Sequence, residues 1–127
     1  MATGPRRTEE FDLSMMQCQC NQVVLAKQVE EAFSFFKRLK GLMFRTHMQS
    51  ETAMLLAPCP QIHTCFMRFA IDVLFLDKQG KVVHVIENMK PWRLSPIVRH
   101  ASQTLEMPSG TLQGRVKTGD QIIFKEI

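Results

Sequence analysis

Two apolar runs, at residues 71–76 and 82–86, flank the polar segment 77–81 and constrain the fold more than any other feature of the chain. A polar connection of this length that contains a glycine predicts a β-hairpin. Both runs are apolar on both faces, which is typical of strands buried inside a sheet. We therefore predict a central hairpin over residues 71–86.

Shorter apolar runs predict further strands, at residues 23–26, 53–57, 104–107 and 121–125. Apolar residues recur at helical spacing over residues 29–40, and Gly41 follows where a helix usually stops, so this segment predicts the one main helix. We expect a flexible leader over residues 1–21 and a single β-rich domain over residues 22–127. The fold class is mainly β, with some α+β character.

Composition limits the classes of function that suit this chain. It has 127 residues, 45% hydrophobic and 22% charged, as expected for one soluble globular domain. The net charge is +4, but the basic residues are scattered, and nine Phe with no Tyr indicate aromatic side chains used in a core. Proteins that bind nucleic acid concentrate basic charge and expose aromatics, so nucleic-acid binding is disfavoured.

No apolar stretch approaches the roughly 18 residues of a membrane helix, and the first ten residues lack the apolar core of a secretory signal. We therefore expect a cytoplasmic protein with no membrane partner. The four cysteines are expected to be reduced in that compartment. We predict no cofactor, and either a monomer or a small homo-oligomer.

The candidate site begins where His63, Cys65 and Met67 alternate with other side chains. In an extended strand, residues two apart point to one face, so these three would share a surface. The apparent strand from residue 62 is too long to be regular, and we expect a bend near residues 68–70. The soft ligands would suit Cu(I), or Zn if Cys59 joined them, which makes residues 59, 63, 65 and 67 an alternative metal site.

Asp72 is the one acid inside the apolar run at 71–76. A buried carboxylate needs a partner, because desolvating a lone charge costs several kcal/mol or raises its pKa. Its structural role would be to accept backbone N–H bonds or to pair with an arginine, and its functional role would be acid–base chemistry. Glu106 is a weaker candidate, because it alternates with Leu105 and Met107 and would simply face water.

The segment 89–101 lacks periodicity and is predicted to be a long loop, which contains Trp92 and Arg93. Loops of this length are often functional, and a tryptophan beside a cation suits an anionic or ring-shaped ligand. Alternatively, the tryptophan pins the loop onto the core.

The chain resembles the domain of unknown function 192 (DUF192) family. The resemblance covers roughly residues 22–125, and its motifs are Arg-Leu-Lys-Gly-Leu-Met-Phe-Arg at 38–45, Ile-His-Thr at 62–64 with Met67, the runs 71–77 and 80–82, Leu-Glu-Met-Pro-Ser-Gly at 105–110, and Gly-Asp at 119–120. It implies a compact domain like a distorted β-sandwich or barrel. It implies no reaction, because the family has none assigned.

These observations favour a noncatalytic module that binds a small ligand or a partner protein. The ligand-binding residues would be His63, Met67, Asp72, Trp92 and Arg93. The alternative is a hydrolase-like or metal-dependent enzyme, with His63 acting together with Asp72 or Cys59. A purely structural subunit is a third possibility.

Overall fold

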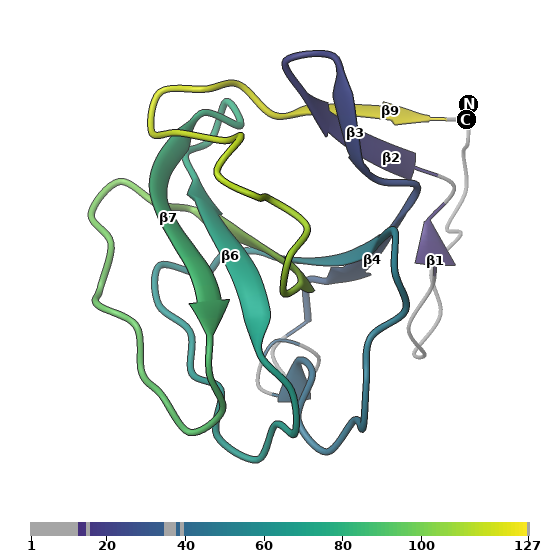
Figure 1. Ribbon diagram of the computed structural model, residues 1–127. Coiled ribbons are helices and arrows are strands. Elements are labelled where there is room, and N and C mark those ends of the chain that lie inside the picture. The colour runs from purple at the N-terminus through teal and green to yellow at the C-terminus, as the bar shows by residue number, and fades with distance from the viewer. Residues whose placement is uncertain (1–12, 15, 35–37, 39, 127) are drawn as a thin grey trace.

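The computed structural model describes residues 13–14, 16–34, 38 and 40–126. Within these ranges the named elements are all β-strands (Figure 1). They are β1 (Leu13–Ser14), β2 (Met16–Cys20), β3 (Val23–Ala26), β4 (Gln28–Ala32), β5 (Thr52–Leu56), β6 (Ile71–Leu76), β7 (Val82–Met89), β8 (Gln103–Pro108) and β9 (Ile123–Glu126). The mainly β class is therefore confirmed.

The strands form two sheets. The larger has the order β1-β4-β5-β8-β6-β7, and the smaller has the order β3-β2-β9. Neighbours are antiparallel except β4 and β5, which are parallel. The small sheet lies over one face of the large one, in an arrangement like a sandwich, and the described strands do not close into a barrel (Figure 1).

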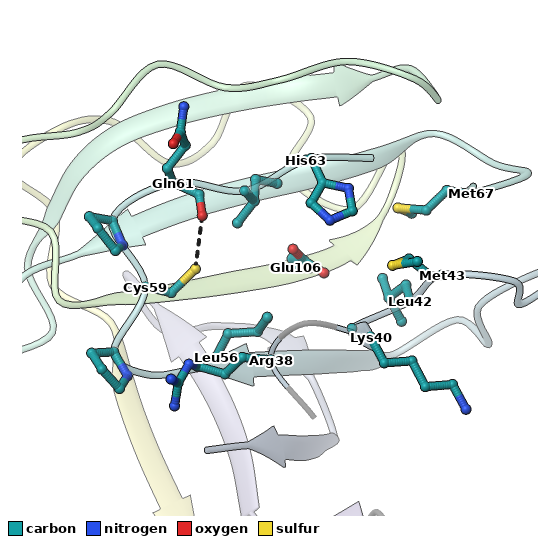
Figure 2. Close-up of a pocket in the computed structure, with 14 residues that line it drawn as sticks. Arg38, Lys40, Leu42, Met43, Leu56, Cys59, Gln61, His63, Met67 and Glu106 are labelled. Carbon is teal, nitrogen blue, oxygen red and sulfur yellow. Dashed lines mark hydrogen bonds between the residues drawn. The ribbon is translucent and has the colours of Figure 1, made fainter. Parts of the chain in front are cut away.

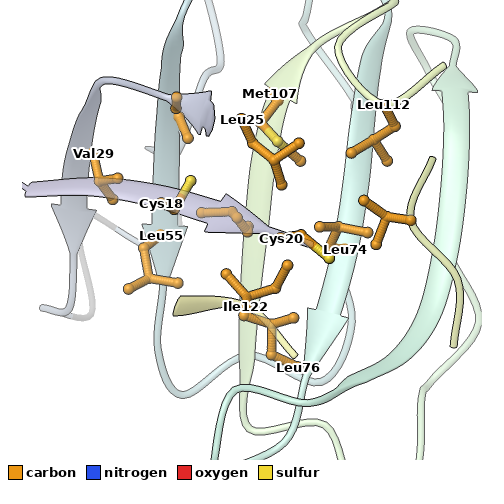
Figure 3. Packing of buried hydrophobic residues seen from close by; sticks show 14 of the residues in the cluster. Cys18, Cys20, Leu25, Val29, Leu55, Leu74, Leu76, Met107, Leu112 and Ile122 are labelled. Atoms are coloured by element: carbon orange, nitrogen blue, oxygen red, sulfur yellow. The ribbon is translucent and has the colours of Figure 1, made fainter. Parts of the chain in front are cut away.

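A first apolar core fills the space between the two sheets. Cys18 and Cys20 of β2 point into it, as do Leu25 of β3 and alternate residues of the large sheet such as Leu74 and Met107 (Figure 3). Successive strand residues point to opposite faces, so the residues between them must lie on the other side of the large sheet. Those residues, such as Val73 and Phe75, belong to a second apolar core.

Irregular segments, rather than a sheet, cover the second core. Leu42, Cys59, Ile62 and Met67 pack there from the connections before and after β5. The large sheet is therefore buried on both faces, which explains the apolar character of its inner strands. The layer of irregular segments is where the candidate site lies.

The hairpin predicted over residues 71–86 is present, with β6 and β7 paired antiparallel. The prediction that the hairpin is central is wrong, because β7 is the last strand of the six-stranded sheet. Of the two hairpin strands, only β6 is paired on both edges. The apolar side chains of β7 reflect packing instead: Val83 and Ile86 contact the second core, and Val82 lies in the first. Burial on two faces does not require two neighbouring strands.

The helix predicted over residues 29–40 is wrong. Its first residues belong to β4, which pairs with β5 from Gln28↔Thr52 to Ala32↔Leu56. Val29 lies in the first core and Ala32 in the second, so residues that would share a helical face are divided between two faces of a sheet. Pairing with β5 outweighs the local helical spacing. The backbone N–H of Arg38 does bond to the carbonyl of Ser34, as in a helical turn, but residues 35–37 and 39 lie outside the described residues.

The ordered domain extends further toward the N-terminus than the predicted leader allows. Met16–Cys20 form β2, and Cys18 is completely buried in the first core. The sequence Met-Gln-Cys-Gln-Cys alternates with a period of two, as a half-buried strand requires. The leader therefore does not include residues 16–20, while residues 1–12 and 15 lie outside the described residues. No described helix is long and apolar enough to cross a membrane.

The buried carboxylate of Asp72 joins β6 to two neighbouring segments. Its Oδ1 accepts the backbone N–H of Asn88 at 2.9 Å. Its Oδ2 accepts the N–H groups of Gly110 at 3.2 Å and Leu112 at 2.9 Å. Asp72 thus has the first of the structural roles expected for it, as an acceptor of main-chain hydrogen bonds.

Replacing Asp72 by alanine should lower the free energy of unfolding by at least about 3 kcal/mol, because three buried or half-buried N–H groups lose their acceptor. Urea unfolding followed by circular dichroism measures the loss.

Asp77→Ala is the matched control. Asp77 also accepts two backbone N–H groups, from Gln79 and Lys81, but in an exposed turn where water replaces the lost acceptor. We expect a loss of about 1 kcal/mol or less for this variant. Equal losses for the two variants would contradict the role given to Asp72.

Candidate functional site

A pocket of about 260 Å³ opens in the layer that covers the second core (Figure 2). Its walls come from the segment before β5 and from the connection between β5 and β6, and its floor is the large sheet. The lining residues are Arg38, Lys40, Gly41, Leu42, Met43, Leu56, Pro58, Cys59, Pro60, Gln61, Ile62, His63, Met67 and Glu106. Most of this surface is apolar, with few polar groups, as in small-molecule sites.

Glu106 of β8 rises from the floor of the pocket, and Figure 2 shows its carboxyl group between His63 on one wall and Leu42 on the other. Its neighbours Leu105 and Met107 point into the first core, so alternation directs Glu106 to the opposite face. It pairs with Met54 on one side and Val73 on the other, both members of the second core. The expectation that Glu106 faces water is wrong, because its face of the sheet is covered: the residue is only 4% exposed.

No group of the described residues makes a hydrogen bond to the Glu106 carboxyl. Burial raises its pKa from the usual 4.5 to about 8, although the charge of Arg45 acts in the opposite direction. Arg45 itself forms two hydrogen bonds to Glu30, at 2.9 and 3.2 Å. At neutral pH, Glu106 is therefore mainly a protonated acid that can donate one hydrogen bond and accept another.

His63 lies on the wall that the connection between β5 and β6 forms. Its Nδ1 accepts the backbone N–H of Cys65 at 3.1 Å. A neutral imidazole that accepts through Nδ1 carries its proton on Nε2, so the ring retains a donor for another partner. The half-buried His63 thus adds a second donor to the lining of the pocket.

Hydrogen bonds to the loop at 89–101 hold in place the wall that carries His63. The fully buried Thr64 donates its hydroxyl to the carbonyl of Lys90 at 2.6 Å and accepts the N–H of Arg93 at 2.8 Å. The N–H of Ile62 donates to the Ser95 hydroxyl at 3.0 Å, and the N–H of Ser95 to the carbonyl of Ile62 at the same distance. The wall is therefore fixed although it contains no regular element.

The single extended face predicted for His63, Cys65 and Met67 is wrong. The chain turns after Thr64: Phe66 has a φ of 65°, and the N–H of Met67 bonds back to the carbonyl of Thr64 at 3.2 Å. His63 and Met67 both reach the pocket, by way of this turn, whereas Cys65 does not line it.

Cys59 lies in the pocket wall with its thiol donating to the carbonyl of Gln61 at 3.2 Å (Figure 2). Burial is the main cause that raises the pKa of this thiol, so it stays protonated and is a weak nucleophile. Cys59 is one of four free thiols. Among the described residues, no three side chains of the His, Cys, Asp and Glu types gather as metal ligands.

The remaining sequence candidates lie outside the pocket lining. Asp72 is engaged by three main-chain groups, as described above. Trp92 is 58% exposed and packs against the ring of Phe66, so it does not pin its loop onto the core. The guanidinium of Arg93 lies 3.5 Å from the carbonyls of Pro91 and Trp92. Of the five residues predicted to bind a ligand, the pocket gathers His63 and Met67.

The pocket contains residues that the predicted ligand-binding set left out. Glu106, only a weaker candidate in the sequence, is the main one, and the others are the cations Arg38 and Lys40 with the apolar hook Leu42-Met43. A signal was present, because the motifs at 38–45, 62–64 and 105–110 were those that carried the family resemblance. Their convergence on one cavity depends on long-range strand pairing.

Comparison with known proteins identifies the family. The model of DUF192, described as "Uncharacterized ACR", matches residues 16–124. The chain belongs to the DUF192 family. A UPF0127 protein of Pyrococcus furiosus is 35% identical over 103 residues, which cover 75% of this chain and 84% of the relative. The family has no assigned reaction.

Solved structures show the same fold. A protein of unknown function from Novosphingobium aromaticivorans superposes with a TM-score of 0.75 at 20% identity, covering 96% of this chain and 91% of that protein. A protein from Sinorhizobium meliloti superposes with a TM-score of 0.71 at 23% identity, covering 88% and 93%. At these identities the likeness concerns the fold alone.

The burial of Glu106 predicts a specific dependence of stability on pH. Between about pH 5 and pH 8 the unfolded chain loses the Glu106 proton while the native chain keeps it. The native state then binds more protons, so the contribution of Glu106 is complete below pH 4.5 and is lost as the pH rises through about 8. Relative to Glu106→Gln, the wild-type free energy of unfolding should fall by up to about 1.4 kcal/mol per pH unit across this window.

Urea unfolding at a series of pH values measures this difference. Glu126→Gln, at an exposed position of β9, is the control and should follow the wild type at every pH. Parallel curves for wild type and Glu106→Gln would show that the Glu106 carboxyl is not held protonated.

Proposed function

We propose that this protein binds a small organic acid with an apolar body in the pocket above Glu106. The observation that carries the proposal is a carboxyl group that is 4% exposed, points into the pocket and has no hydrogen-bonding partner among the described residues. Such a group costs about 1–3 kcal/mol when it is left unsatisfied. A ligand that supplies a hydrogen-bonding partner removes this cost.

The polar lining suits an acceptor-rich, negatively charged ligand. His63 offers an N–H and protonated Glu106 offers an O–H. Arg38 and Lys40 also line the pocket and add positive charge, with their charged ends directed away from Glu106 (Figure 2). Among the described residues of the lining, Glu106 carries the one carboxyl group, and it is mainly neutral at pH 7. A carboxylate would accept hydrogen bonds from His63 and Glu106 without facing a like charge.

The apolar lining supports a hydrophobic body of limited size. Leu42, Leu56 and Ile62 supply aliphatic surface, and the thioethers of Met43 and Met67 adapt to ligands of different shape. The pocket volume of about 260 Å³ lies just below the range of about 300–1,000 Å³ that is usual for drug-sized ligands. The ligand is therefore a short-chain or single-ring acid.

Acid–base catalysis in the same pocket is the second candidate. It is favoured by an acid with a pKa of about 8 placed in the same pocket as an imidazole. The pairs of His63 with Asp72 or with Cys59 are less suitable, since Asp72 is saturated by main-chain groups and the Cys59 thiol stays protonated. Turnover of small esters that is lost in both His63→Gln and Glu106→Gln would favour this candidate.

Titration with hexanoate and benzoate tests the binding proposal. At pH 7 each should raise the melting temperature and give a saturable calorimetric signal. Affinity should fall as the pH rises through about 8, because ionised Glu106 then repels the ligand carboxylate.

Glu106→Leu should abolish binding and still fold, because it replaces an unpaired buried acid by an apolar side chain of similar volume. Glu126→Gln is again the matched control. Failure of both acids to bind, or undiminished binding by Glu106→Leu, would refute the proposal.

A further inference from the structure

Three aromatic side chains form an exposed cluster outside the pocket. Phe66 packs between Phe44 and Trp92, with ring centroids 5.3 Å from the first and 4.8 Å from the second. Phe44 is 63% exposed, Phe66 48% and Trp92 58%. Large apolar side chains that gather on a surface mark an interaction site more often than isolated ones.

The backbone under this cluster is strained at each of its members. Phe44, Phe66 and Trp92 have φ values of 68°, 65° and 64°, in the left-handed region that bulky residues avoid. Each such residue costs about 1–3 kcal/mol. Main-chain bonds maintain the arrangement: the N–H of Phe44 donates to the carbonyl of Phe66 at 3.0 Å, and that of Trp92 to the carbonyl of Thr64 at 2.9 Å. Core burial does not explain strain at side chains this exposed.

The segments 60–70 and 89–101, which carry Phe66 and Trp92, have basic side chains but no acidic ones. They contain no Asp or Glu, and all four of their Lys and Arg residues are exposed, namely Arg68, Lys90, Arg93 and Arg99. The second segment also exposes two aliphatic side chains, Leu94 at 70% and Ile97 at 69%. Leu94 pairs with His63 of the first segment in an isolated β-bridge, so the two segments lie side by side.

We propose that this surface docks on an anionic lipid bilayer, with the aromatic cluster in the interfacial region and the four cations against the lipid headgroups. Rings such as those of Trp92 and Phe66 are favoured at a membrane interface, and each Lys or Arg near an anionic surface adds attraction. Reversible association needs both contributions, since neither alone is strong. The site lies on the surface, is separate from the ligand pocket and does not rest on the function proposed for it.

Two observations favour a bilayer over single-stranded nucleic acid. The rings pack against one another with interplanar angles of 37° and 57°, so they do not present parallel faces for stacked bases. The aliphatic side chains of Leu94 and Ile97 gain from hydrocarbon but have no role in stacking. The expectation of no membrane partner came from the lack of an apolar stretch long enough to span one, whereas docking requires only loops.

Trp92 makes the test direct, because the chain has one Trp and no Tyr, so its fluorescence reports on this surface alone. Vesicles of phosphatidylcholine with phosphatidylserine should shift the emission to shorter wavelength and carry the protein into the pellet on sedimentation. Vesicles of phosphatidylcholine alone should bind more weakly, and added salt should weaken binding to the anionic vesicles.

Two variants separate the apolar and charged contributions. Phe66→Asn should bind about tenfold more weakly, while keeping its melting temperature, because asparagine tolerates a left-handed backbone. Arg93→Gln should bind about fivefold more weakly. Ile123→Ala and Lys78→Gln are the matched controls, exposed apolar and basic residues on other parts of the surface, and should bind like the wild type.

Absence of binding to the anionic vesicles would overturn the proposal. Equal losses in the control variants would also overturn it, since binding would then depend on overall charge and hydrophobicity. Quenching of Trp92 by an oligothymidine single strand, without vesicle binding, would replace the bilayer by nucleic acid as the partner.

Discussion

Strand β8 is paired on both edges, with β5 and β6, and its side chains are enclosed on both faces of the sheet. This double enclosure decides the chemistry of the candidate site. Leu105 and Met107 occupy the first core, and the pleat of the strand then leaves Glu106 no direction except the second. Burial there disfavours the charged form and makes Glu106 a neutral acid at neutral pH.

The layer over the second core shows how irregular chain acquires a fixed geometry. Buried polar side chains replace the hydrogen-bonding ladder that a second sheet would provide. Thr64 links the His63 wall to the loop at 89–101, and the Thr104 hydroxyl donates to the carbonyl of Cys59 at 2.8 Å. Because these bonds are made to the main chain, they position neighbouring side chains without restricting which residues occupy those positions. The pocket and the aromatic cluster both depend on this layer.

Three segments that carried the family resemblance meet at one pocket. The motif at 38–45 supplies Leu42 and Met43, the motif at 62–64 supplies His63, and the motif at 105–110 supplies Glu106. The other acidic candidate of the sequence, Asp72, belongs to the framework instead, as an acceptor for three N–H groups. Two buried acids of this sheet therefore differ in role, because one is surrounded by main-chain donors and the other by apolar side chains.

Local patterns in the sequence determined the β class, the strands at 23–26 and 71–76 and the turn between β6 and β7, since alternation and turn residues act over a few positions. Tertiary structure alone decided three other features: β4 in place of a helix, the outer position of β7, and the burial of Glu106. Each depends on how segments distant in sequence are arranged: β5 lies beside β4, the strand order ends at β7, and the irregular layer covers the Glu106 face of β8. The period of a segment shows that it has two faces, but only the assembled fold shows what covers each of them.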